Sequence, residues 1–202
     1  MSRKMSVSLE IYTHEYLWRA AKLMLEKALQ EANANKRDSD YFLISALLMS
    51  YMAFEAFINF SGYVLLPKIW AEERKHFKGK KGGVEAKIAE LLEIIIDYGW
   101  KKDERPYKNI RKLKEFRDAV AHGKVKASQY EAIFKEDRSH IRWEHDWDKF
   151  ISTEKAKIFF HDIKSFCQSL LESMRKKSDH LHLIYDAFEG TLGSATGRSD
   201  IR

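Results

Sequence analysis

The chain has 202 residues, of which 45% are hydrophobic and 33% are charged, so it is long enough to bury one substantial core. Its formal net charge of +6 favours polyanionic partners only slightly, because many soluble proteins are mildly basic. Only two prolines and nine glycines interrupt it, which disfavours a β architecture of many short strands. We therefore expect a single all-α domain over residues 1–189, a bundle of four to five long helices, and a flexible tail over residues 190–202.

The use of cysteine and the N-terminal sequence both bear on where the protein works. Cys167 is the single cysteine, which excludes an intrachain disulfide and fits a reducing compartment. It lies in an apolar helical pattern, so we expect it to be packed and inert. Basic residues Arg3 and Lys4 are not followed by an apolar run, so no signal peptide is predicted. We expect a cytoplasmic protein.

The first predicted helix covers residues 9–34, where apolar residues recur at core spacing and charged residues occupy the opposite side. A polar connection follows, and Ser39 or Asp40 is a suitable N-cap for the next helix.

The most hydrophobic segment, residues 41–66, predicts a second helix that Pro67 ends. The segment is long enough to cross a membrane. However, Glu55 and Asn59 interrupt it together with two serines, and a central acid is costly in lipid. We therefore expect the central helix of a soluble bundle and no membrane span.

Two further helices are predicted between Pro67 and Gly123. The third covers residues 84–98. The fourth runs over residues 106–122, with Pro106 as an early residue and Gly123 as a left-handed cap.

The pattern weakens after the fourth helix. Alternating apolar residues predict a short irregular or extended arm, in which Trp143 and Trp147 are expected to cover the end of the core rather than to stack on bases. A last long helix is predicted over residues 152–176, followed by a shorter helix over residues 181–188.

We expect no metal and no cofactor. His161 and His182 fall on helical patterns and are predicted to lie at the surface or at the edge of the core. The arm holds a group of metal-capable side chains that lacks helical ligand spacing and cysteine support, so we interpret it as a solvated charged loop: His140, His145, Asp146 and Asp148.

The end of the fourth predicted helix carries the most informative residues of the chain, Arg117, Asp118 and His122. Arginine has a permanent planar charge that fits phosphate oxygens, and histidine exchanges a proton easily near neutral pH. With an adjacent acid, these side chains suffice for metal-free chemistry on a phosphodiester. A strongly basic segment, residues 101–114, leads directly into them.

The periodicity of this helix predicts where those side chains point. One apolar face must point into the core, whereas Asp118 and His122 lie on a second, ionisable face. Arg117 lies at the edge of the core face, where its stem can pack and its guanidinium can reach sideways. Its candidate partners are Glu55 and Asn59 of the second helix.

Spacing alone does not single out this pair, because other arginine–histidine pairs have similar spacing: Arg138 with His145, Arg175 with His180, and Arg175 with His182. Only Arg117 and His122 combine a polar residue after the arginine, a core-facing helix, a following glycine and a basic approach.

An all-helical chain with an arginine, a polar residue and a histidine at the end of its penultimate long helix resembles the HEPN superfamily. Residues 54–59 and 106–110 of this chain also resemble patterns found in that superfamily. The resemblance covers residues 9–174. It implies a helical bundle, usually dimeric, and in many members a metal-independent ribonuclease that acts as a toxin or antiviral effector.

The resemblance implies that His122 transfers protons and that Arg117 stabilises charge on the phosphoryl oxygens, which leaves a 2′,3′-cyclic phosphate. Asp118 would orient His122 or keep it protonated. A two-fold dimer would supply the second histidine from a composite groove, flanked by Lys114, Lys124 and Lys126. A nucleotidyltransferase-type antitoxin is the partner that such a toxin would have.

Beside the ribonuclease, a second interpretation remains open at the level of sequence, in which Arg117 and His122 are structural. A histidine before a glycine at a helix end is stabilised by the helix dipole, and an arginine at a core edge commonly makes a structural salt bridge. The protein would then be a non-catalytic HEPN-like module that binds nucleic acid, nucleotide or protein.

Overall fold

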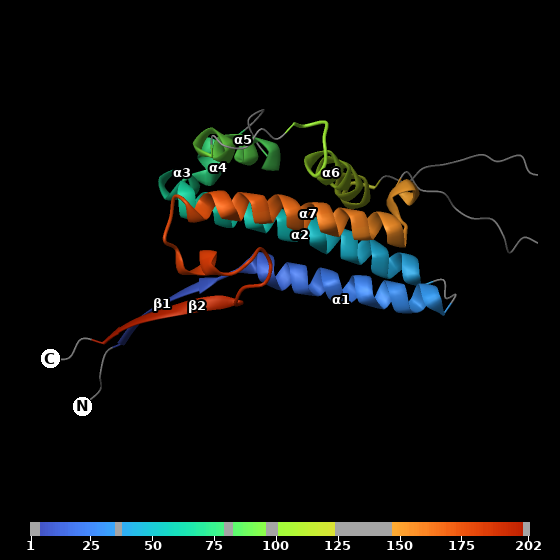
Figure 1. The fold of residues 1–202 in the computed structure, drawn as a ribbon, viewed down its shortest axis with the longest axis horizontal. Helices are drawn as coiled ribbons and strands as arrows, with labels where there is room; N and C mark the ends of the chain where they lie inside the picture. The colour runs from blue at the N-terminus through green and yellow to red at the C-terminus, as the bar shows by residue number, and fades with distance from the viewer. Residues whose placement is uncertain (1–4, 35–37, 79–82, 96–100, 124–146, 200–202) are drawn as a thin grey trace, which may run out of the picture.

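The computed structural model describes residues 5–34, 38–78, 83–95, 101–123 and 147–199 (Figure 1). Most of these residues are helical, which confirms the predicted all-α fold class. The long helices are α1 (Thr13–Asn33), α2 (Ser39–Leu65), α6 (Tyr107–Ala121) and α7 (Thr153–Arg175). The short elements are α3 (Pro67–Ala71), α4 (Glu73–His76), α5 (Val84–Ile94) and the 3₁₀ turns Asp148–Phe150 and Leu181–Ile184.

Helix α2 is the centre of the bundle, because α1, α5, α6 and α7 all pack against it (Figure 1). It can fill this place because it is apolar around most of its circumference. Tyr51, Phe54, Phe57 and Ile58 are almost completely inaccessible to solvent. By length and composition alone α2 could also cross a membrane, and half of its most apolar window is buried inside the protein.

A two-stranded antiparallel sheet joins the two ends of the described chain. Strand β1 (Met5–Ile11) pairs with β2 (Gly193–Ser199), so that Ile11 lies opposite Gly193. The predicted helix start at residue 9 is therefore wrong, and so is the flexible tail for residues 193–199. Local periodicity could not show this sheet, because each strand obtains its hydrogen-bonding partner from the other end of the chain.

The predicted helix boundaries hold to within a few residues elsewhere, with local corrections. Asp38, rather than Ser39 or Asp40, occupies the N-cap position of α2, without a capping hydrogen bond from its side chain. Gly123 does not adopt the left-handed conformation that was expected of it. The helix expected over residues 181–188 is only the short 3₁₀ turn.

Ser152 caps α7, because its side-chain oxygen accepts a hydrogen bond from the backbone N–H of Lys155 at 3.2 Å. Cys167 on the same helix is fully buried, as expected, and burial raises the pKa of its thiol.

Residues 124–146, which include most of the predicted arm and Trp143, lie outside the described part of the chain. Trp147 is described and packs against the core, beside Gly123 at the end of α6. The prediction that this tryptophan covers the end of the core is confirmed.

Candidate functional site

Arg117 joins α6 to α2 through an ion pair. Its Nη2 lies 2.7 Å from Oε1 of Glu55, so the expected contact with the second helix is present. The guanidinium also lies over the ring of Tyr51, with Cζ 5.3 Å from the ring centroid. These contacts fix the arginine at the junction of the two helices, with 28% of its side chain exposed.

The surroundings of Arg117 keep it charged. Burial by itself lowers the pKa of Arg117, but the carboxylates of Glu55 and Asp118 raise that pKa above its ordinary value. The hydroxyl of Tyr51 is buried, and no hydrogen-bond partner for it lies among the residues that the structure describes. Burial, reinforced by the charge of Glu55, raises the pKa of Tyr51 above its usual range, so this hydroxyl stays protonated.

Asp118 binds two cations. Its Oδ1 lies 2.7 Å from Nη1 of Arg117, and its Oδ2 accepts a hydrogen bond of 2.6 Å from Nζ of Lys114. Glu55, Arg117, Asp118 and Lys114 thus form a row of alternating charges with no net charge. Lys114, which was predicted to flank an RNA path, is held by this row.

His122 is the exposed member of the predicted site. It is the C-cap residue of α6, and its backbone N–H donates to the carbonyl of Asp118 at 3.0 Å. Within the part of the chain that the structure describes, its imidazole has no hydrogen-bond or ion-pair partner. The carboxylate of Asp118 is directed to Arg117 and Lys114 rather than to this ring.

Asn59, the other supporting residue expected on α2, does not bind Arg117. Its Oδ1 accepts a hydrogen bond of 2.7 Å from Nζ of Lys87 on α5, and Lys87 also forms an ion pair with Glu73. Glu55 and Asn59 line one polar cavity of about 250 Å³, together with residues of α4 and the start of α5: Glu73, Arg74, Phe77, Gly83, Val84 and Lys87.

The remaining predicted residues divide into two groups. Lys124 and Lys126, and the alternative pair Arg138 and His145, lie outside the described residues. Arg175 has a structural role, since its Nε donates to the carbonyl of Leu183 at 2.6 Å.

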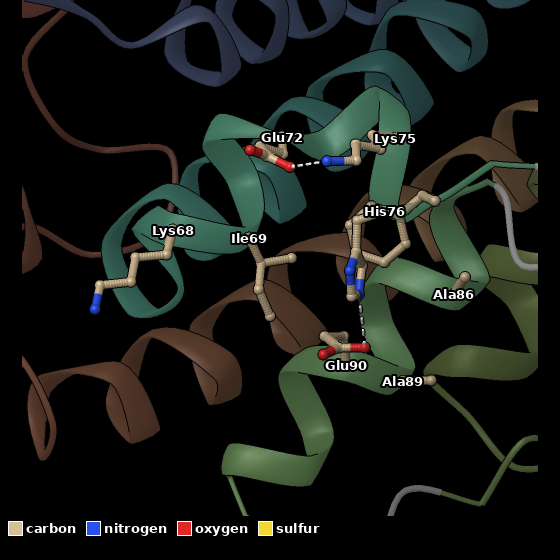
Figure 2. A pocket seen from close by; sticks show the side chains of 9 residues that line it. Lys68, Ile69, Glu72, Lys75, His76, Ala86, Ala89 and Glu90 are labelled. Carbon is tan, nitrogen blue, oxygen red and sulfur yellow. Dashed lines mark hydrogen bonds and ion pairs between the residues drawn. The ribbon is translucent and has the colours of Figure 1, made fainter.

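A larger pocket of about 750 Å³ lies between α3, α4 and α5 (Figure 2). Its ionisable side chains pair with one another: His76 lies 3.5 Å from Glu90, and Lys75 lies 2.9 Å from Glu72. Lys68 points away from these pairs in Figure 2. None of the residues lining this pocket belongs to the predicted phosphodiester site.

A buried polar cluster at the start of α1 was not predicted from the sequence. His14, Glu15 and His182 come together there, with exposures of 1%, 0% and 5%. His182 was expected at the surface or core edge and is instead enclosed. Burial, together with the charge of His182, lowers the pKa of His14 to about 3. The adjacent His14 and Glu15 were a weak signal, because their partner lies at the other end of the chain.

Comparisons of this chain with protein-family models, with curated proteins and with solved structures find no match to any of the three.

Proposed function

We propose that the protein is a metal-independent endoribonuclease of the HEPN type. The observation that carries this proposal is the placement of two side chains at the end of α6: a charged guanidinium fixed by Glu55, and a solvent-facing imidazole at His122. An anchored cation and an exposed proton-transfer group on the same end of a helix are the minimal equipment for phosphodiester cleavage without a metal.

The reaction uses the ribose itself as nucleophile. His122 takes the proton of the 2′-hydroxyl as the 2′-oxygen forms a bond to phosphorus. The bond from phosphorus to the 5′-oxygen breaks, and the leaving oxygen receives a proton from a second imidazole. Arg117 stabilises the negative charge that develops on the phosphoryl oxygens. The products are a 2′,3′-cyclic phosphate and a free 5′-hydroxyl.

The second imidazole is supplied by a second copy of the chain. An isologous dimer repeats every interface residue across its axis, so two ends of α6 would place two copies of His122 in one groove. RNA in that groove would pass Lys114, Lys124 and Lys126. Because Lys114 pairs with Asp118, a phosphate that binds Lys114 would replace the carboxylate of Asp118 as its partner.

One observation favours the non-catalytic alternative as a second candidate. The charge of Arg117 is already balanced by Glu55 and Asp118, each 2.7 Å away. A phosphate must displace one of these carboxylates or bind on the remaining N–H groups. If neither occurs, the arginine only ties α6 to α2, and the module binds nucleic acid, nucleotide or protein without cleaving RNA.

The deciding experiment incubates purified protein with end-labelled RNA in EDTA and maps the ends of the products, with circular dichroism to confirm that the protein stays folded. We expect cleavage that leaves cyclic phosphates and that fails at a 2′-deoxy position. His122→Ala should reduce the rate by roughly 10²- to 10⁴-fold, as for the loss of a proton-transfer group. Arg117→Ala should reduce it by roughly 10²- to 10³-fold, as for the loss of a charge-stabilising donor.

His161→Ala is the matched control, because His161 is an exposed histidine on α7 and has no part in the site. Its rate should equal that of the wild type. Cleavage that persists unchanged in a folded His122→Ala variant would remove the assigned role of this residue. Binding of RNA without cleavage in the wild type would instead support the non-catalytic module.

We further propose that the enzyme acts in the cytoplasm, in toxin–antitoxin or antiviral defence, under the control of a nucleotidyltransferase-type antitoxin. Expression of this protein without that partner should slow the growth of the host cells. His122→Ala should abolish this effect at an equal level of folded protein.

A further inference from the structure

We propose that His14, Glu15 and His182 form a zinc-binding site that fastens the start of α1 to the C-terminal segment. This reverses the expectation that the protein holds no metal. The inference does not depend on the proposed nuclease function, because the start of α1 lies beside β1 and β2, whereas α6 lies beyond α2 and α7 on the other side of the bundle (Figure 1).

The three ligand atoms form a triangle of the right size for a tetrahedral metal. Nε2 of His14 lies 3.3 Å from Nε2 of His182, and Oε1 of Glu15 lies 3.8 Å and 3.5 Å from these two nitrogens. Zinc bonds of about 2.0–2.1 Å to nitrogen and oxygen give tetrahedral edges of about 3.3–3.4 Å. A zinc ion can therefore sit above this triangle after shifts of a few tenths of an ångström.

Among the described residues, no lysine or arginine forms an ion pair with the buried carboxylate of Glu15. Glu15 is fully buried, and its Oε1 accepts one backbone hydrogen bond, from Gly190 at 2.9 Å. Its Oε2 has no hydrogen-bond partner within the described part of the chain. The guanidinium of Arg19 is used elsewhere, since it donates to the carbonyl of Gly190. An isolated buried carboxylate is costly, and a divalent cation between it and the two imidazoles offsets that cost.

The neighbouring residues pack closely around the two imidazoles and the carboxylate. A Cβ at position 190 would lie 2.3 Å from Cε1 of His182 and 3.0 Å from Oε1 of Glu15, so only glycine fits there. Tyr12 stacks on the ring of His182, with ring centroids 3.8 Å apart. Two residues before the glycine, Phe188 has a φ of 65°, an uncommon backbone conformation for a bulky residue.

The donor set and its burial favour zinc in a structural role. Two imidazole nitrogens and one carboxylate oxygen are ligands that zinc commonly takes. The fourth position falls to Oε2 of Glu15 or to a water molecule. Because His14 and His182 are 168 positions apart, a metal here closes nearly the whole chain into one loop.

The competing interpretation is a cluster without metal, in which one imidazole donates a hydrogen bond to the other across the same 3.3 Å. Zinc binding distinguishes the two. Full-length protein is stripped with chelator, incubated with ZnCl₂, desalted, and analysed for zinc by mass spectrometry. We expect one zinc per chain, and a visible absorption spectrum of four-coordinate Co²⁺ when CoCl₂ replaces ZnCl₂.

Binding should also raise the melting temperature of the wild type. Zinc at about 100 times its Kd should increase Tm by roughly 5–10 °C for a domain of this size. His182→Gln and Glu15→Gln should lose both the bound zinc and the Tm shift. The matched control is His180→Asn, which removes a neighbouring histidine but keeps a side-chain acceptor at the cap of the 3₁₀ turn.

The wild type alone can overturn the proposal, so it does not depend on whether the buried variants fold. Chelator-stripped, folded wild type that retains no zinc and shows no Tm shift contradicts the site. Zinc retained equally by a folded His182→Gln variant places the metal elsewhere. Failure here leaves RNA cleavage by Arg117 and His122 unaffected, because that assay is carried out in EDTA.

Discussion

At the scale of single residues, Asp162 on α7 is a buried carboxylate that binds both an arginine and an asparagine. Its side chain is 3% exposed, and Arg105 binds both oxygens, with Nη2 at 2.7 Å from Oδ1 and Nε at 2.9 Å from Oδ2. Nδ2 of Asn109 donates to Oδ2 at 2.7 Å. Burial by itself raises the pKa of Asp162, but these hydrogen bonds lower it below its ordinary value.

We therefore predict that Asp162→Asn destabilises the protein by roughly 1.5–3 kcal/mol near neutral pH, because charge-assisted hydrogen bonds are lost in a buried place. Since the folded-state pKa of Asp162 is lowered, the unfolded chain binds its proton first. The contribution of the carboxylate is complete above the unfolded pKa and is lost as pH falls through the folded one.

Urea unfolding of wild type and variant between about pH 6 and pH 2 tests this prediction. The difference in unfolding free energy should shrink as the pH falls. A difference that stays constant over that range would show that the residue contributes through packing rather than through its charge. Lys164→Gln, an exposed substitution on the same helix, serves as control.

Within the candidate site, the position of Arg117 could be predicted from the sequence, whereas the contacts of Asp118 could not. The sequence placed Arg117 at the edge of the core face of its helix with Glu55 and Asn59 as candidate partners, and the structure shows the contact with Glu55. The sequence could not show that Asp118 would turn to Lys114 instead of His122, because competing contacts on one helix face are decided by side-chain conformations.

At the scale of elements, the junction between α2 and α3 depends on close contact with the indole of Trp70. A Cβ at Gly62 on α2 would lie 1.9 Å from Cε2 of Trp70 on α3. The glycine is what allows the short helix to fold back so closely after Pro67.

We predict that Gly62→Ala destabilises the protein by roughly 1–3 kcal/mol, as overpacking does, although alanine has the higher helix propensity by about 1 kcal/mol. A lower unfolding free energy in the variant would therefore show that the packing clash outweighs the gain in helix propensity. Combining it with Trp70→Ala should remove the clash, so that thermal unfolding shows less additional destabilisation from Gly62→Ala in that background. A stabilising Gly62→Ala would contradict this contact.

The long helices were the predictable elements. Residues 41–66 and 152–176 carry long apolar patterns at helical spacing, and α2 and α7 follow them within a few residues. The strands were not predictable, because Leu9 and Ile11 of β1 are 71% and 73% exposed, so their hydrophobicity does not report burial.

At the scale of the whole molecule, the proposed nuclease needs two copies of the chain for two imidazoles. We predict that the protein is a dimer by light scattering, and that the cleavage rate per chain falls when dilution shifts it to monomer. A rate per chain that stays constant at concentrations where only monomer is present would contradict a composite site.

The sequence by itself determined the helical class, the central place of α2 and the arrangement of Arg117 at the core edge, because apolar periodicity reports which face of a helix is buried. Only the tertiary structure decided that the chain ends pair as β1 and β2 and that His14, Glu15 and His182 meet in the interior. Those contacts join residues more than 160 positions apart, and no local pattern records which distant partner a strand or a buried side chain will find.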